Sequence, residues 1–205
     1  MTRIYSTKLL MLILLYLLPA VMIAGEHWVG VSSQSPASSE IKVSGNLNSS
    51  AEVTVAIPGF YLNEAPFEGK ALTLPQIPGG HPMLEQGNPD LQKLSFTLQL
   101  PANGLMQVSV SSSKFTEYSG IEIVPSAGNS TRDGLANPLF KSPSYLTDAF
   151  FPGKLVDSEQ PFIVRNTRAQ SFQVYPFQYN PITKVLRVYY QLTLTVVNAG
   201  GEGDN

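Results

Sequence analysis

Side chains that could carry out catalysis or hold a metal are sparse in this chain. The 205 residues include two histidines, at positions 27 and 81, and no cysteine. Without cysteine or a Ser-His-acid grouping, little material remains for nucleophilic catalysis, disulfides or thiolate metal sites. The acidic residues are scattered singly and form neither a calcium loop nor a paired-carboxylate spacing. We therefore expect no catalytic residue, metal or cofactor, and we interpret His81, in a loop between Gly80 and Pro82, as solvated.

The charge of the chain argues against nucleic acid as a partner. Charged residues make up 14% of the chain, and the formal net charge is −2. The sequence has no basic run of the length that phosphate binding needs. Ser, Thr, Asn and Gln replace the usual charged residues, as is typical of an extracellular β protein.

The elements that would position functional residues are predicted to be short β-strands. Apolar and polar residues alternate with a period of two over 93–100 and 186–196, as in half-buried strands. Weaker or shorter strand-like runs lie at 41–47, 51–57, 105–111, 121–124 and 161–166. No amphipathic helix of ten or more residues is indicated. Closely spaced strands and turns predict an all-β fold, an antiparallel, jelly-roll-like β-sandwich with long loops.

The C-terminal part of the chain is predicted to form a β-hairpin. An aromatic-rich run over 171–179 is followed by the alternating run over 186–196. Between them, Asn180 can bond its own backbone and Pro181 fixes φ at the first turn position. Pro176 cannot donate to a strand ladder, so we expect an edge or a bulge there.

The hairpin and several upstream segments together resemble one family in order and spacing. The segments are Gly87–Leu91, Ser111–Phe115, Ile123–Gly128, Phe151–Gly153, Pro161–Arg165 and Gln178–Tyr189. This set is similar to the propeptide domain of gingipain-type cysteine peptidases, and the resemblance extends over residues 44–197. Gln92 departs from it, because the family has a second proline at that position.

The resemblance implies a propeptide that chaperones folding of a zymogen and inhibits its peptidase until cleavage. The implied partner is the cognate gingipain-type cysteine peptidase catalytic domain, a cysteine endopeptidase. The Cys-His dyad of that family lies in this separate domain, which the chain lacks, so we expect a protein that is not an enzyme.

The resemblance also implies an inhibitory loop. In the pattern Pro125-Ser126-x-Gly128-x-x-x-Arg132, the basic residue would enter the peptidase's specificity pocket. A guanidinium can pair with an acidic pocket through a bidentate bond, and a loop held by a rigid sandwich loses little entropy on docking. The alternative for Arg132 is an ordinary solvated arginine beside Asp133.

Two further arginines are candidate peptidase contacts. Arg165 and Arg168 flank the end of the short run over 161–166, where the family also carries basic residues. The alternative is that they are charges at a strand end that keep an edge soluble.

The N-terminus predicts export. Arg3 and Lys8 accompany an apolar run over 9–24, which ends at small residues, so residues 1–25 read as a secretory signal peptide. The run is too short to span a bilayer, and we expect no stable membrane span after signal cleavage. The expected location is secreted or extracytoplasmic, in the periplasm or at the surface of a bacterium. The rest divides into a flexible segment 26–40, the sandwich 41–197 and a disordered tail 198–205.

Other functions remain open from the residues alone. A secreted adhesion or carbohydrate-binding module fits the low charge and the aromatic residues, and it requires exposed aromatics on a sheet face. A structural spacer at a cell surface is a third interpretation. The chain could be a stand-alone inhibitor or the truncated product of a longer gene.

Overall fold

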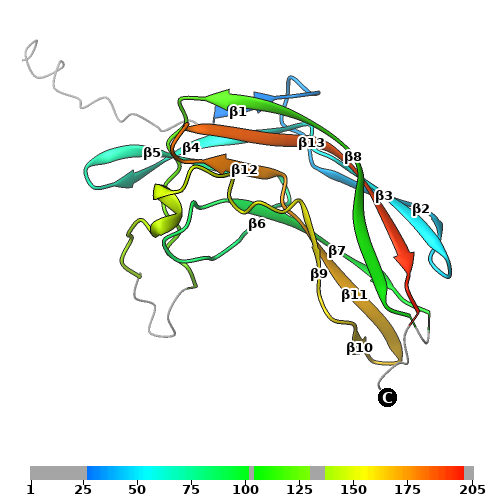
Figure 1. The fold of residues 1–205 in the computed structure, drawn as a ribbon. Coiled ribbons are helices and arrows are strands. Elements are labelled where there is room, and N and C mark those ends of the chain that lie inside the picture. The colour runs from blue at the N-terminus through cyan, green and yellow to red at the C-terminus, as the bar shows by residue number, and fades with distance from the viewer. Residues whose placement is uncertain (1–26, 102–103, 130–136, 201–205) are drawn as a thin grey trace, which may run out of the picture.

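The computed structural model describes residues 27–101, 104–129 and 137–200 (Figure 1). The strands are β1 (His27–Gly30), β2 (Glu40–Asn46), β3 (Ser50–Ala56), β4 (Gly59–Phe67), β5 (Lys70–Gln76), β6 (His81–Pro82), β7 (Gln92–Gln99), β8 (Met106–Ser119), β9 (Val156–Ser158), β10 (Phe162–Val164), β11 (Thr167–Val174), β12 (Phe177–Asn180) and β13 (Val185–Asn198). A short 3-10 helix, η2, covers Pro143–Leu146. Within the described ranges, no helix is long and apolar enough to cross a membrane.

The strand β13 is the centre of the first five-stranded sheet. β8 pairs along one whole edge of it, while β12 and β3 share the other edge, and β2 extends the sheet beyond β3. Alternate side chains of β13 are fully buried, as a period of two requires: Leu186, Val188, Leu192, Leu194 and Val196. The strand predicted over 186–196 is therefore confirmed.

The second five-stranded sheet has the order β10-β11-β7-β6, and β9 pairs with β11 on the same edge as β10. Its buried residues include Leu94, Leu98, Phe172 and Val174. These pack with the inward residues of the first sheet in one hydrophobic core. Phe60 and Phe177 meet there edge to face, with ring centroids 5.5 Å apart. The predicted antiparallel β-sandwich is confirmed.

The chain changes sheets at Tyr175-Pro176. The run over 171–179 was expected to be one strand of a hairpin, but β11 belongs to the second sheet and β12 to the first. Of these two strands, β12 pairs with β13 and β11 does not, so the expected hairpin is wrong for residues 171–174. Because Pro176 has no N–H, it cannot continue a ladder, and its carbonyl instead accepts a bond from Tyr189 N at 2.8 Å.

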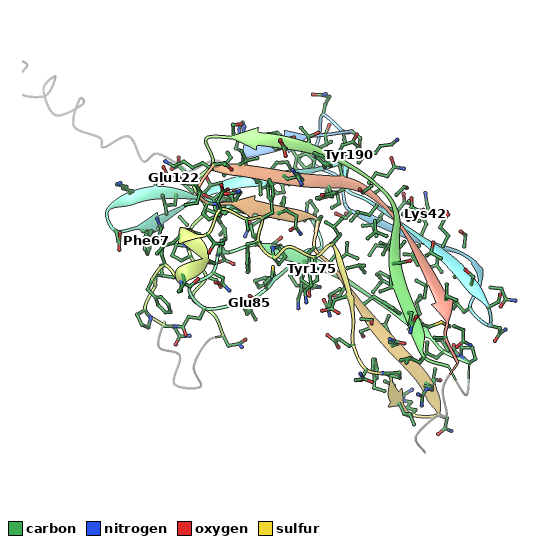
Figure 2. All side chains as sticks on the ribbon, in the orientation of Figure 1. Lys42, Phe67, Glu85, Glu122, Tyr175 and Tyr190 are labelled. Atoms are coloured by element: carbon green, nitrogen blue, oxygen red, sulfur yellow. The ribbon has the colours of Figure 1, made fainter. Side chains whose placement is uncertain are left out.

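A third, three-stranded sheet has the order β1-β4-β5. The segment expected to be flexible over 26–40 therefore differs at His27–Gly30, which pairs with β4 along its whole length. The β4–β5 hairpin extends from one end of the molecule, and Figure 2 shows Phe67 and Glu122 at that end. The run 121–124, expected to be a strand, instead makes an isolated bridge from Ile123 to Thr73.

Candidate functional site

The loop that carries the predicted inhibitory residue begins and ends at one point of the structure. Arg132 itself lies outside the described residues. On either side of it, the Asn137 side-chain amide donates to the carbonyls of Ala127, at 2.9 Å, and Asn129, at 2.5 Å. A single side chain therefore holds together the two ends of the loop, which we call the first stem (residues 123–129) and the second stem (residues 137–146).

The two stems are also attached to the segment 87–90, which we call the loop platform. The bonds to the first stem run from Gly87 N to Ser126 O (2.9 Å), Ser126 N to Asn88 O (2.8 Å) and Asp90 N to Val124 O (2.9 Å). On the second stem, Ser142 N donates to Gly87 O at 2.9 Å, and the Ser142 hydroxyl donates to Asn88 Oδ1 at 2.5 Å. Two segments that resemble the family, far apart in sequence, thus join to support the loop.

Glycine is required at position 87 of the platform. Its φ of 80° lies in the left-handed region that residues with a Cβ rarely adopt. A Cβ there would also lie 2.6 Å from Phe140 Cε2. The platform therefore depends on a residue that lets the second stem approach closely.

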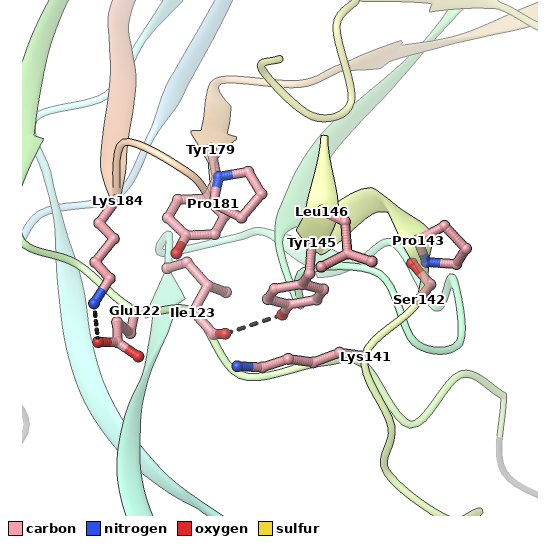
Figure 3. A pocket seen from close by; sticks show the side chains of 10 residues that line it. All are labelled: Glu122, Ile123, Lys141, Ser142, Pro143, Tyr145, Leu146, Tyr179, Pro181 and Lys184. Atoms are coloured by element: carbon pink, nitrogen blue, oxygen red, sulfur yellow. Dashed lines mark hydrogen bonds and ion pairs between the residues drawn. The ribbon is translucent and has the colours of Figure 1, made fainter. Parts of the chain in front are cut away.

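A pocket of about 390 Å³ lies beside the second stem (Figure 3). The residues lining it are Glu122, Ile123, Lys141, Ser142, Pro143, Tyr145, Leu146, Tyr179, Pro181 and Lys184. The buried Tyr145 hydroxyl donates to Ile123 O at 2.9 Å, which ties η2 to the first stem. Burial raises the pKa of Tyr145 far above its usual value, so this phenol stays a neutral donor.

Positive charge is concentrated around this pocket. Lys184 Nζ pairs with Glu122 Oε1 at 2.6 Å. The hydrogen bond and the charge of Lys184 lower the pKa of the Glu122 carboxyl, and the charges of Lys141 and Lys70 lower it further. One carboxylate is therefore influenced by three ammonium groups, of which Lys184 pairs with it directly and Lys141 also lines the pocket.

The second stem carries several large apolar side chains that are exposed and that lie near the pocket-lining residues in the sequence. Leu139 is 41% exposed, Phe140 47% and Leu146, which lines the pocket, 83%. Ile182, in the β12–β13 turn next to the lining residue Pro181, is also exposed. Exposed apolar groups gathered around polar ones are typical of a protein-binding surface.

The structure does not bring the other two predicted site residues to this surface. Arg165 is exposed in the β10–β11 turn, and Arg168 Nε donates to Gly104 O at 3.3 Å. In Figure 1, β10 and β11 lie at the opposite end of the molecule from the β4–β5 hairpin. Their role as peptidase contacts stays a prediction, and the hydrogen bond of Arg168 gives it a structural role as well.

Most aromatic residues of the C-terminal strands are buried, and Tyr190 on β13 is half-buried. Tyr175, Phe177, Tyr179 and Tyr189 are all buried. They are therefore unable to form the exposed aromatic face that a carbohydrate-binding module requires, and this removes the main support for that interpretation.

The sequence interpretation did not single out Lys141 or Tyr145. Lys141 lies within 125–144, which has no strand-like alternation, and Tyr145 follows directly after it. The sequence does offer one signal, since the large apolar pair Leu139-Phe140 directly precedes a lysine in a stretch rich in polar residues, glycine and proline.

Comparison with known proteins identifies relatives of the whole sandwich. Residues 44–203 match the family Propeptide_C25. The chain is 37% identical over 134 residues to gingipain R1 and 34% identical over 163 residues to gingipain R2, both from Porphyromonas gingivalis. These alignments cover 64% and 76% of this chain but only 14% and 22% of the relatives. The chain therefore spans less than a quarter of their length.

Two solved structures from Porphyromonas gingivalis share the fold. The complex of the RgpB pro- and mature domains matches with a TM-score of 0.74 and 30% identity, covering 80% of this chain and 86% of that chain. A structure that concerns the zymogenic latency of gingipain K matches with a TM-score of 0.72, covering 84% and 97%. At 16% identity, the second match shows the fold alone.

Proposed function

The chain belongs to the Propeptide_C25 family of gingipain-type propeptides, and on this premise we propose that it holds a cognate gingipain-type cysteine peptidase inactive. The observation that carries the proposal is the similarity to a prodomain solved in complex with its mature domain. The partner is the catalytic domain of an Arg- or Lys-specific peptidase. The propeptide acts sterically and turns over no substrate.

In this proposal Arg132 occupies the specificity pocket of the peptidase. Support comes from the described stems, because Asn137 and the platform fix the points where the loop leaves and rejoins the sandwich. Fixed stems reduce the conformational entropy lost when the loop enters a cleft. A guanidinium then pairs with an acidic pocket through two parallel hydrogen bonds.

The proposal includes export. Residues 1–25 act as the signal peptide, and the sandwich of 41–197 is the part that reaches the peptidase outside the cytoplasm. N-terminal sequencing of the exported protein should give a chain that begins at or next to Glu26. An exported species that still begins at Met1 contradicts this part.

Inhibition in trans tests the proposal directly. Mature gingipain R2 is a suitable peptidase, because this chain is 34% identical to part of the gingipain R2 sequence. We expect substrate-competitive inhibition in the nanomolar range, measured with a peptide substrate. Absence of binding to both gingipain R1 and gingipain R2 contradicts the proposed function.

Substituting the loop arginine tests the mechanism separately. Arg132→Ala should weaken inhibition at least about a hundredfold, because it removes a buried charge-assisted anchor. Arg132→Lys, which keeps the charge but loses the bidentate geometry, is the matched control and should lose less. Unchanged inhibition by Arg132→Ala would remove the residue from the mechanism.

A further inference from the structure

The pocket beside the loop has an excess of positive charge that its own residues do not neutralise. Glu122 is the single carboxylate among the lining residues, and it is already paired with Lys184 at 2.6 Å. Among the described residues, no carboxylate lies within ion-pair distance of Lys141. Asp90, on the platform, does not line the pocket. An added anion would therefore balance the charge there.

The ammonium of Lys141 is held in place by aromatic rings. Its Nζ lies 5.2 Å from the centre of the Tyr145 ring and 5.5 Å from that of Phe67. Both rings are buried, and Tyr145 is fixed further by its bond to Ile123 O. Such cation–π contacts orient a lysine that would otherwise sample many rotamers, so less entropy is lost when it binds. Figure 3 shows the Lys141 side chain extended along the pocket toward Glu122.

The surroundings of the pocket favour a protein partner over a free ion. Leu146 lines the pocket with its side chain 83% exposed, and Pro143 and Pro181 line it as well. Apolar residues around a charged group exclude water when a partner covers them, and this strengthens the interaction with the charge. A free small anion would leave these residues exposed.

We propose that the pocket receives an aspartate or glutamate side chain from the mature domain of the cognate peptidase, with Lys141 as its partner. This inference rests on the proposed function but concerns a second contact, separate from Arg132. The second stem carries both the end of the inhibitory loop and Lys141, so a peptidase that admits the loop passes close to the pocket. The pocket thus acts as an anchor outside the active-site cleft.

The test compares Lys141→Glu and Lys141→Met with wild-type protein. Lys114→Glu, at an exposed position on β8, is the matched control for the change in net charge. The probe is mature gingipain R2, used active for inhibition constants and with its active-site cysteine alkylated for binding. Lys141→Glu should raise the dissociation constant from both forms about tenfold to a hundredfold, and Lys141→Met less. Lys114→Glu should change it less than about twofold.

Ionic strength gives a second readout. The association rate of wild-type protein should fall more steeply with added salt than that of Lys141→Met, since a charge pair at an interface steers association. A single Asp→Lys or Glu→Lys substitution on the peptidase that restores binding to Lys141→Glu would identify the partner residue. The thermal unfolding midpoint of the variants should fall by no more than a few degrees, because Lys141 is exposed and each of its two cation–π contacts contributes only modestly to stability.

The outcomes separate the two proposals. If wild-type protein does not inhibit, the proposed function fails. If wild-type protein inhibits and Lys141→Glu binds the peptidase equally well, the pocket is not an anchor and this inference is overturned. If Lys141→Glu instead abolishes self-association in sedimentation, with peptidase binding intact, the occupant is a second copy of this chain and the inference is again overturned.

Discussion

The strand β13 and the loop-bearing segment 122–146 differ in how their backbones are hydrogen-bonded and in how far their side chains are buried. In β13, ladders join both edges to neighbouring strands. Every second side chain from Leu186 to Val196 is buried, with one exception beside a β-bulge. In the described parts of 122–146, a few hydrogen bonds to the platform, to Thr73 and from Asn137 hold the backbone, and several large side chains remain exposed. Stability and recognition therefore reside in separate regions, and substitutions should affect one without the other.

The largest difference in stability between the two regions is expected when one leucine of each is replaced by alanine. Leu192→Ala in β13 should lower the free energy of unfolding by about 3–5 kcal/mol, because Leu192 is fully buried and its loss leaves a cavity. Leu146→Ala is the matched control and should change stability by less than about 0.5 kcal/mol, since that side chain is exposed. Urea unfolding followed by circular dichroism measures both.

The same pair should behave in the reverse way in binding. At temperatures where Leu192→Ala is folded, it should inhibit like wild type, whereas Leu146→Ala should bind the peptidase more weakly. Equal effects of the two substitutions on stability, or equal effects on inhibition, would contradict the division into scaffold and recognition surface.

An intermediate effect is expected at the clamp between the loop stems. Asn137→Ala removes both bonds that join the stems, so the loop should lose more entropy on docking and inhibition should weaken about fivefold. Stability should fall by no more than about 1 kcal/mol. Asn166→Ala, in the exposed β10–β11 turn, is the control for inhibition assays. A loss of inhibition no larger than that of Asn166→Ala would show that the clamp does not preorganise the loop.

The smallest effect concerns the platform and depends on pH. Burial raises the pKa of the Asp90 carboxyl, so the folded protein binds a proton more tightly than the unfolded chain does. Stability from this group is present below its ordinary pKa of 3.8 and is lost as pH rises through the raised value. Asp90→Asn should therefore stabilise the protein at pH 7, by less than about 1 kcal/mol after solvent screening, and not at pH 3.

Thermal unfolding across this pH range measures the difference between Asp90→Asn and wild type. Glu64→Gln, at an exposed position on β4, serves as the control and should show no comparable gain at pH 7. A stabilisation by Asp90→Asn that is the same at pH 3 and pH 7 would mean that ionisation of the carboxyl is not its cause.

Local patterns predicted the strands better than they predicted the partners of those strands. The strand-like runs 41–47 and 51–57 appear as β2 and β3, which pair with each other. The runs 93–100 and 105–111, joined by a turn, lie in different sheets, because β7 pairs with β11 and β8 with β13. Alternation shows which side chains face a core, but many residues far along the chain decide which strand lies alongside.

The candidate site was predicted only in part for a related reason. The family resemblance drew attention to the loop and Arg132. The clamp by Asn137, the support from 87–90 and the position of Lys141 over two rings all join residues of separate segments. No spacing in the sequence specifies contacts of this kind.

By itself, the sequence determined the all-β class, the alternation of the strands and the family, since these follow from local side-chain order. The tertiary structure decided where Pro176 moves the chain between sheets, which segments support the loop and where a charged pocket forms. These features depend on long-range packing, in which the burial of the whole core outweighs local preference.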